Sequence, residues 1–307
     1  MFQYTLDNKR YHTLNYFFKK KFGQKVMKVP LDVNAPCPHK QNGGCIFCSN
    51  RSKANIIIDT QNIIEQFNNT KSILEKKWPN SLYIPYFQSG TNTYLDVETL
   101  KDLIEKLLRL PKVVGIAIAT RPDTINEEWY KYLNELNKKT FLMIELGLQS
   151  SKESTLQLIN RGHGTTEFTN AIKRLQQNKI FTVAHIINGL PHESKEDMLN
   201  TIKYLNHLGI NGLKIHMLFI CKNTKLAHLY KNNPFPILSK EEYIDIVCEQ
   251  LSLLKDSIVI ERITGDPDQE ELIAPTWVIK KFCVLNDIDK MMKEKNYYQG
   301  CKEKSII

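Results

Sequence analysis

The sequence predicts an α/β fold: a partial, TIM-like (βα)6 barrel with a C-terminal α/β extension. Short apolar runs rich in β-branched residues alternate with longer amphipathic runs, which is typical of parallel βαβ units. The 307 residues are 42% hydrophobic and 24% charged, enough for a sizeable core. Six buried-looking strands favour an open barrel over a closed barrel of eight strands.

The expected strands are bounded by Gly, Pro or Asn, and the expected helices place apolar residues three and four apart. The strands span 26–34, 82–88, 113–119, 141–148, 181–187 and 212–220. The helices span 62–78, 97–110, 127–139, 167–178 and 195–209. Because active residues of parallel barrels collect at the carboxyl ends of the strands, functional residues are expected there.

Three segments are expected along the chain. Residues 1–25 form a basic, aromatic N-terminal arm, 26–230 form the partial barrel, and 231–307 form an extension packed on it. Within the extension, 232–243 is a linker leading into a helix, 258–268 is a strand ending in a turn, and the tail is a last helical element.

Positive charge is concentrated at the N-terminus. The chain has a net charge of +9, and residues 1–28 hold seven basic residues against one acidic residue. Interleaved aromatic rings suit an RNA surface, but a solvated arm whose rings pack on the body fits equally well. No signal-peptide pattern and no membrane-spanning apolar run occur, so a cytoplasmic protein without membrane contact is expected.

Three of the seven cysteines form a cluster in the sequence. Cys37, Cys45 and Cys48 lie in CPHKQNGGCIFC, directly after the first expected strand, and the other four are scattered. Clustering without even pairing favours a metal site over disulfides. Gly43 and Gly44 allow a sharp bend before the Cys-x2-Cys turn.

The type of metal site stays open at this point. Thiolates favour iron–sulfur clusters or zinc. A [4Fe–4S] cluster on three cysteines leaves one iron free to bind the amino and carboxylate groups of S-adenosylmethionine (SAM). A structural zinc site needs a fourth ligand, which His39 could supply.

The order of motifs resembles the radical SAM superfamily, and more closely its YtqA/YhcC-like (MnmL-type) family, which is related to the Elongator catalytic subunit. The resemblance covers nearly the whole chain. Seven residues separate the first two cysteines instead of the commoner three, as in that branch of the superfamily. The motifs are KVPLDVNAPCPHKQNGGCIFCSN, YFQSGTNTY, ATRPD, IELGLQS, RGHG, IINGLP, GLKIHMLFICKNTKL, RITGDPD, APTW and YYQG.

The resemblance implies one [4Fe–4S] cluster on the three cysteines and SAM bound at the strand ends. Glu145 is a carboxylate inside an apolar run and needs a partner, while the forked guanidinium of Arg161 suits the SAM carboxylate. Packing or turn roles remain the alternative at each position. The implied SAM contacts are Phe47, Gly90, Thr91, Asn92, Thr120, Glu145, Gln149, Arg161, Asn188 and Gly189.

Other polar residues receive weaker expectations. His185, His216 and Cys221 could point into the barrel, although such residues more often belong to the core. Arg121 could contact SAM or form a turn with Asp123. The sequence identifies no catalytic residue.

The implied chemistry is reductive cleavage of SAM to methionine and a 5′-deoxyadenosyl radical, which takes a hydrogen atom from the substrate. A flavodoxin- or ferredoxin-type donor would supply the electron. The implied substrate is tRNA with 5-carboxymethylaminomethyl-uridine at the wobble position, converted to 5-aminomethyl-uridine for a partner methyltransferase. Two alternatives remain: a radical SAM enzyme acting on a small molecule or protein, and a non-catalytic zinc or RNA-binding module.

Overall fold

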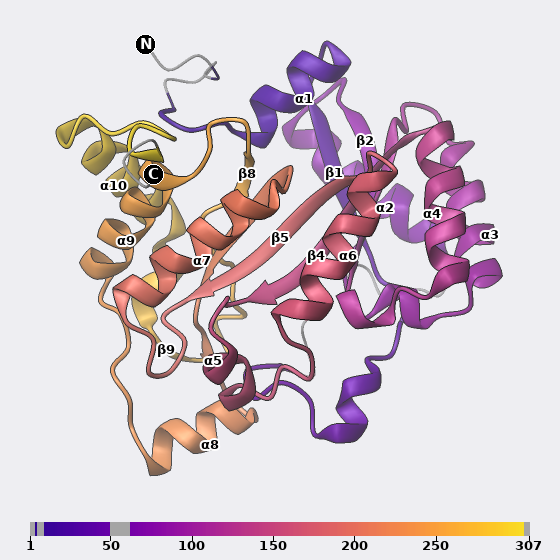
Figure 1. Ribbon diagram of the computed structural model, residues 1–307. Helices are drawn as coiled ribbons and strands as arrows, with labels where there is room; N and C mark the ends of the chain where they lie inside the picture. Colours follow the sequence, from indigo (N-terminus) through magenta and orange to yellow (C-terminus); the bar gives the residue numbers. More distant parts are fainter. Residues whose placement is uncertain (1–3, 5–8, 50–61, 304–307) are drawn as a thin grey trace.

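A parallel sheet of seven strands, curled into a half-barrel, organises the chain (Figure 1). The computed structural model describes residues 4, 9–49 and 62–303. The strand order is β1-β2-β3-β4-β5-β6-β8. The strands are β1 (Val26–Leu31), β2 (Leu82–Phe87), β3 (Gly115–Thr120), β4 (Phe141–Gln149), β5 (Phe181–Asn188), β6 (Gly212–Met217) and β8 (Val259–Arg262).

Helices cover the convex face of this sheet (Figure 1). Most of the long helices begin at a polar capping residue, such as Ser194 before α7 and Ser239 before α9, whose side chains bind free backbone N–H groups. The helices are α1 (Leu14–Phe22), α2 (Ile63–Lys77), α3 (Val97–Leu108), α4 (Glu127–Lys139), α5 (Glu153–Leu158), α6 (Thr165–Gln177), α7 (Lys195–Leu208), α8 (Lys225–Asn232), α9 (Lys240–Leu253) and α10 (Lys281–Glu294).

The predicted α/β half-barrel is confirmed, with one correction in strand number. The segment expected as one strand over 212–220 divides into β6 and a short β7 (Ile220–Cys221), which pairs antiparallel with β9 (Leu272–Ala274). The seventh strand of the main sheet, β8, comes from the C-terminal extension and pairs in parallel with β6. The extension therefore completes the sheet as well as packing on it.

The two faces of the sheet bury different kinds of side chain. On the convex face, residues such as Ile118, Ile144 and Ile186 pack against the helices. On the concave face, the alternate residues form an apolar layer near the start of the strands, which includes Ile84 and Met143. This alternation follows from the two-residue period of a strand and places every inward side chain in a layer.

The N-terminal segment packs its aromatic rings on the start of the strands. Helix α1 places Phe18, which is 1% exposed, against Phe141, and Phe17 against Phe181. These rings are part of a hydrophobic cluster, so they do not form an RNA-stacking surface. The expected arm is thus a helix over this part of its length, and residues 1–3 and 5–8 of it lie outside the described residues.

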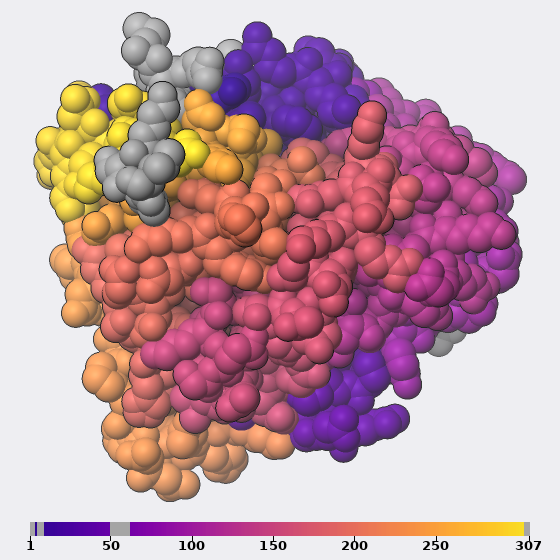
Figure 2. All heavy atoms as spheres, viewed as in Figure 1, coloured from indigo at the N-terminus to yellow at the C-terminus, as the bar shows by residue number. Residues whose placement is uncertain are grey.

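The two ends of the described chain lie side by side, which Figure 2 shows as indigo next to yellow. Gln299, in the YYQG motif, is 1% exposed and its amide donates to the carbonyl oxygens of Lys255 and Ile258. Its backbone N–H donates to Arg10, and its side-chain oxygen accepts from the N–H of His12. This late motif therefore has a structural role. Among the described residues, no helix is long and apolar enough to cross a membrane.

Candidate active site

The cysteine loop lies at the carboxyl end of β1, at the opposite end of the sheet from α1 (Figure 1). Backbone hydrogen bonds hold Ile46 between Ile159, after α5, and Leu226, in α8, at 3.0 and 2.8 Å. The amide of Asn160 donates to the carbonyl of Gly44 at 2.7 Å. Two other parts of the chain therefore fix the shape of this loop.

Glycines set the path of the loop. Gly43 and Gly44 have φ angles of +86° and +66°, which few other residues adopt readily. Gly90, after β2, has φ +74°, and a Cβ atom there would lie 2.0 Å from the carbonyl oxygen of Ala35. The QSGTNTY motif thus packs directly against the chain two residues before Cys37.

His39, the possible fourth zinc ligand, is engaged in packing. Its Nε2 lies 2.7 Å from the carbonyl oxygen of Asn160, and its ring lies against Gly162, where an added Cβ would be 2.4 Å from Nδ1. Both ring nitrogens therefore face protein atoms, and the fourth position of a zinc site has no support from this residue.

The three thiols are free and lie close enough to interact electrostatically. Burial raises the pKa of Cys48, and the neighbouring Cys45 and Cys37 raise it further. Arg161 donates from Nη1 to Cys45 Sγ over 3.6 Å. In the part of the chain that the structure describes, no group of three or more His, Cys, Asp or Glu side chains is arranged to hold a metal ion.

Arg161 and Gln149 converge over Gly147, at the carboxyl end of β4. Arg161 is 6% exposed and donates from Nη2 to the carbonyl of Gly147 at 2.8 Å. A Cβ on Gly147 would lie 2.6 Å from Arg161 Nη2 and 2.7 Å from Gln149 Nε2, so only glycine leaves room for both. The Nε of Arg161 is buried and has no hydrogen-bond partner among the described residues.

Arg121, which follows β3, forms a hydrogen bond with the backbone of Arg161. Its Nη1 donates to the carbonyl of Arg161 at 3.1 Å, and its Nε and Nη2 bind both carboxylate oxygens of Asp123 at 3.0 and 2.9 Å. Burial alone would raise the pKa of Asp123, but the two bonds from Arg121 outweigh it and lower that pKa. The guanidinium of Arg121 is thus committed to the Arg–Asp turn.

Glu145, expected to bind SAM, is saturated by protein donors. Its carboxylate is fully buried and accepts from Lys28, Lys214, Tyr86 at 2.6 Å and His185 at 2.8 Å. Burial would raise the pKa of this carboxyl group, but the two lysines hold it well below its usual range. This carboxylate therefore does not need SAM as a partner.

We call the layer formed by Lys28, Tyr86, Glu145, His185, Lys214 and Glu261 the barrel floor; His216 flanks it. These residues come from β1, β2, β4, β5, β6 and β8, so the layer crosses most of the concave face. Lys28 Nζ lies 2.9 Å from Glu261 Oε2 and joins the two edge strands of the sheet. The rings of His185 and His216 lie 5.9 Å apart.

The turn after β2 holds its own polar groups together. The amide of Asn92 is fully buried and donates to the carbonyls of Phe87, Ser89 and Ala119 at 3.1, 3.2 and 2.8 Å. The hydroxyl of Thr120 lies 2.7 Å from that of Thr93. Asn92 and Thr120 therefore shape the turn, while Thr91 is 2% exposed beside them.

Asn188 and Gly189, at the end of β5, face the C-terminal extension. The side-chain amide of Asn188 exchanges two hydrogen bonds with that of Gln250, at 2.8 and 2.9 Å. A Cβ on Gly189 (φ +84°) would lie 3.1 Å from Leu238. Phe47 packs in a small cluster with Ile46, and Cys221 lies in β7, outside the main sheet.

Sequence reasoning missed four members of the barrel floor: Lys28, Tyr86, Lys214 and Glu261. The sequence could have indicated two of them. Lys28 and Lys214 are charged residues inside apolar strands, at alternate positions whose side chains point to the concave face. His185 and His216 were predicted to face the interior, and the contact of His185 with Glu145 confirms this for His185.

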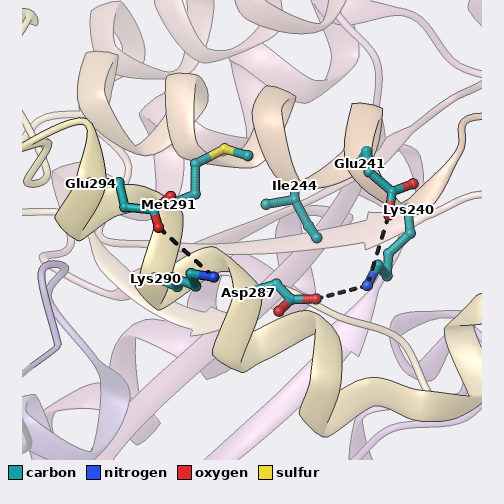
Figure 3. Close-up of a pocket in the computed structure, with 7 residues that line it drawn as sticks. All are labelled: Lys240, Glu241, Ile244, Asp287, Lys290, Met291 and Glu294. Carbon is teal, nitrogen blue, oxygen red and sulfur yellow. Dashed lines mark hydrogen bonds and ion pairs between the residues drawn. The ribbon is translucent and has the colours of Figure 1, made fainter.

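A surface hollow of about 210 Å³ lies elsewhere, between α9 and α10 (Figure 3). Lys240 pairs with Asp287 at 2.8 Å, and Lys290 pairs with Glu294 at 3.9 Å. Its charged groups are thus paired with one another, and it contains no cysteine, so it is not a candidate for the active site.

The chain belongs to the radical SAM superfamily. Its residues 37–205 match the Radical SAM superfamily, and residues 210–294 match the Radical_SAM C-terminal domain. It is therefore a radical SAM enzyme, and its cofactors are a [4Fe–4S] cluster and SAM. Enzymes of this superfamily also need an electron donor.

Three individual proteins are similar to this chain in sequence or in fold. The chain is 40% identical to the uncharacterized protein YtqA of Bacillus subtilis over 97% of this chain and 94% of that one. It is 27% identical to the tRNA uridine(34) acetyltransferase of Methanocaldococcus infernus over 50% of this chain and 29% of that one. The solved structure of Elp3 from the same archaeon matches the fold with a TM-score of 0.68 at 17% identity, over 90% of this chain and 65% of that one.

The residues at the site have the chemistry that these cofactors need, although the three thiols are not gathered around one point in this structure. Three free thiols supply soft ligands, and three cysteines are fewer than the four positions of the cluster. The buried Arg161 Nε needs an acceptor, which a carboxylate provides, and Gly147 leaves space beneath it. When bound, the cluster supplies the electron that cleaves SAM and starts radical chemistry on the substrate.

Proposed function

We propose that this enzyme modifies tRNA at the wobble uridine, converting 5-carboxymethylaminomethyl-uridine to 5-aminomethyl-uridine. One observation carries the proposal: half of the chain aligns with a protein named tRNA uridine(34) acetyltransferase. The likeness to Elp3 agrees with it at the level of the fold. The net charge of +9 suits a polyanionic substrate.

In this proposal Cys37, Cys45 and Cys48 hold the cluster. Arg161 binds the SAM carboxylate, for which its buried and unpartnered Nε supplies a charged donor. Gln149 has a φ angle of +79° and carries its side-chain amide close to Gly147, and in this proposal that amide donates to the SAM ribose.

The remaining expected SAM contacts divide into two groups. Phe47, Gly90 and Thr91 line the two loops beside the cysteines and remain proposed contacts through their backbone. Asn92, Thr120 and Asn188 act by shaping turns, because their side chains are bound to protein partners. Glu145 acts in the barrel floor, and Gly189 provides the backbone turn that Leu238 covers.

Partners follow from the same proposal. A flavodoxin- or ferredoxin-type protein would supply the electron, and a methyltransferase would use the aminomethyl product. The two partners would act at different places. The electron donor would approach the cluster loop, and the methyltransferase would bind the tRNA after its release.

The test profiles modified nucleosides by mass spectrometry in tRNA from cells lacking the gene. We expect 5-carboxymethylaminomethyl-uridine to accumulate and its downstream forms to disappear. The wild-type gene and Cys283→Ala, a change at an exposed cysteine far along the sequence in α10, should restore them, and Cys45→Ala should not. Identical profiles with and without the gene would refute the tRNA substrate and direct the search to small-molecule or protein substrates.

A further inference from the structure

Two hydrogen-bond acceptors in the barrel floor receive no donor from the part of the chain that the structure describes. The side chain of Glu261 is only 1% exposed, and its Oε1 atom has no hydrogen-bond partner among the described residues. His185 uses its Nε2 to contact Glu145, which leaves Nδ1 as its second ring nitrogen. A buried carboxylate oxygen without a donor is costly, so its presence calls for a ligand or water.

The tautomer of His185 makes Nδ1 an acceptor. Burial lowers the pKa of this imidazole, and the neighbouring Lys214 lowers it further, so the ring is neutral at pH 7. Glu145 is ionised and can only accept hydrogen bonds. The proton of the neutral ring must therefore sit on Nε2, and Nδ1 carries a free lone pair.

The donors of the floor are already in use. Lys28 Nζ contacts Glu145, Glu261 at 2.9 Å and the sulfur of Met143 at 3.5 Å. Lys214 Nζ contacts Glu145, Tyr86 at 3.1 Å and Glu261 at 3.5 Å. An ammonium group has three protons: Lys28 has a protein acceptor for each of them, and Lys214 makes two hydrogen bonds and lies 3.5 Å from a second carboxylate.

Solvent still reaches this layer from the concave side. The side chain of His185 is 20% exposed, and those of Lys28 and Lys214 are 13% and 10% exposed. The same face leads along the strands to Gly147, Gln149 and the cysteine loop at their carboxyl ends. A group bound at the floor would therefore lie on the inner side of the sheet, below the proposed SAM site.

We propose that the barrel floor is the substrate-recognition site and that it binds an N–H donor, specifically an amine, through His185 Nδ1 and Glu261 Oε1. The inference rests on the proposed function and deepens it. The amine of the carboxymethylaminomethyl group is a donor of this kind, whereas an anionic group would meet lysines that are already engaged with Glu145 and Glu261. His185 and Glu261 are thus specificity-determining residues, and Glu145 is a positioning residue that fixes the tautomer of His185.

Two substitutions remove the acceptors with little change of shape. His185→Gln keeps a donor for Glu145 but has no acceptor at the place of Nδ1. Glu261→Gln keeps an oxygen for Lys28 and turns an amide NH2 group toward the ligand. His207→Gln, at an exposed position in the last turn of α7, is the matched control.

The experiment uses anaerobically reconstituted full-length protein, SAM, a reductant and tRNA from cells lacking the gene. For both floor variants we expect kcat/KM for tRNA to fall about tenfold or more, the size of one lost hydrogen bond to a charged group. Iron content and SAM cleavage without tRNA are measured on the same variants, so that a defect in the cofactors is told apart from a defect in recognition. Unchanged kcat/KM in both variants, or an equal loss of tRNA-free SAM cleavage, would overturn the inference.

A second readout separates this inference from the proposed function. If wild-type protein leaves the tRNA unchanged, the proposed function fails. Nitrogen-15 spectra of histidine-labelled protein then report the tautomer of His185 without any substrate. A proton on Nε2 with a bare Nδ1 supports the recognition site, and a proton on Nδ1, or a charged ring at neutral pH, overturns it.

Discussion

Lys28 in the first strand and Glu261 in the last strand form an ion pair of 2.9 Å across the open side of the half-barrel. The two strands share no backbone pairing, because they are the opposite edges of the sheet. Lys28 also binds Glu145 in the central strand. One buried lysine therefore ties both edges and the centre of the sheet together.

The first prediction concerns this lysine. Lys28→Met should lower the free energy of unfolding by about 3–5 kcal/mol, because it leaves two buried carboxylates with one cation fewer. Lys101→Met removes an exposed pair with Glu98 and should cost at most about 1 kcal/mol. Urea unfolding measures both. Equal, small losses would mean that the floor does not depend on the pair.

Gly90 should be irreplaceable for the cysteine loop. Gly90→Ala combines a left-handed φ with a clash against the carbonyl of Ala35, so we expect a loss of several kcal/mol, about 2–4, and poor iron uptake. Gly209→Ala has a similar φ of +67° but open space around the new Cβ, and should cost about 1 kcal/mol. Thermal unfolding and iron content test this pair of variants, and similar values for both would contradict it.

Arg161 should matter more for SAM than for the cluster. Arg161→Lys keeps the positive charge near Cys45 but loses the planar guanidinium, so SAM affinity should fall about tenfold or more while iron content changes much less. Arg174→Lys is the control, because Arg174 makes a two-pronged pair with Glu127 on the surface. Equilibrium binding of SAM to the reconstituted protein is the measurement. Wild-type affinity in Arg161→Lys would remove this residue from the SAM site.

Glu193 should make stability depend on pH. Burial raises its pKa to about 7, although hydrogen bonds from Ser150 and Thr155 oppose this. The folded protein thus keeps a proton that an unfolded glutamate, with a pKa of about 4.3, releases. Between these two values stability falls as pH rises, and the loss is complete above pH 7.

Glu193→Gln removes that dependence. Its melting temperature should exceed that of wild type at pH 8, and the difference should shrink as the pH falls toward 4.5. Glu196→Gln, at an exposed position in α7, should give no pH-dependent difference. A constant difference between Glu193→Gln and wild type at all pH values would count against the assignment.

Much of the fold followed from local pattern. The strand carrying Ile144 and the helix carrying Leu100 could be predicted because their apolar periods reflect burial on one or two faces. The strand around Ile260 was predicted, but its place as the seventh strand of the sheet was not, since its sequence looks the same whether it pairs with β6 or packs elsewhere. Which distant strands pair with each other depends on the whole fold, and the alternation of apolar and polar residues within one strand does not determine it.

The candidate site, too, could be predicted only in part from the sequence. The cysteine loop and Arg161 were visible as ordered motifs. The roles of Glu145 and Asn188 were not, because their partners, Lys214 and Gln250, lie 69 and 62 residues further along the chain. A buried carboxylate signals that a partner exists, and only the fold decides whether that partner is a ligand or a lysine.

The central claim is radical modification of tRNA by a cluster on three cysteines. Its most direct test incubates reconstituted protein, SAM and reductant with tRNA from cells lacking the gene, and measures 5′-deoxyadenosine and modified nucleosides in the same samples. We predict that 5′-deoxyadenosine and 5-aminomethyl-uridine appear together, and that neither forms with Cys45→Ala. Formation of 5′-deoxyadenosine by the wild-type protein with no change in the tRNA would contradict the claim.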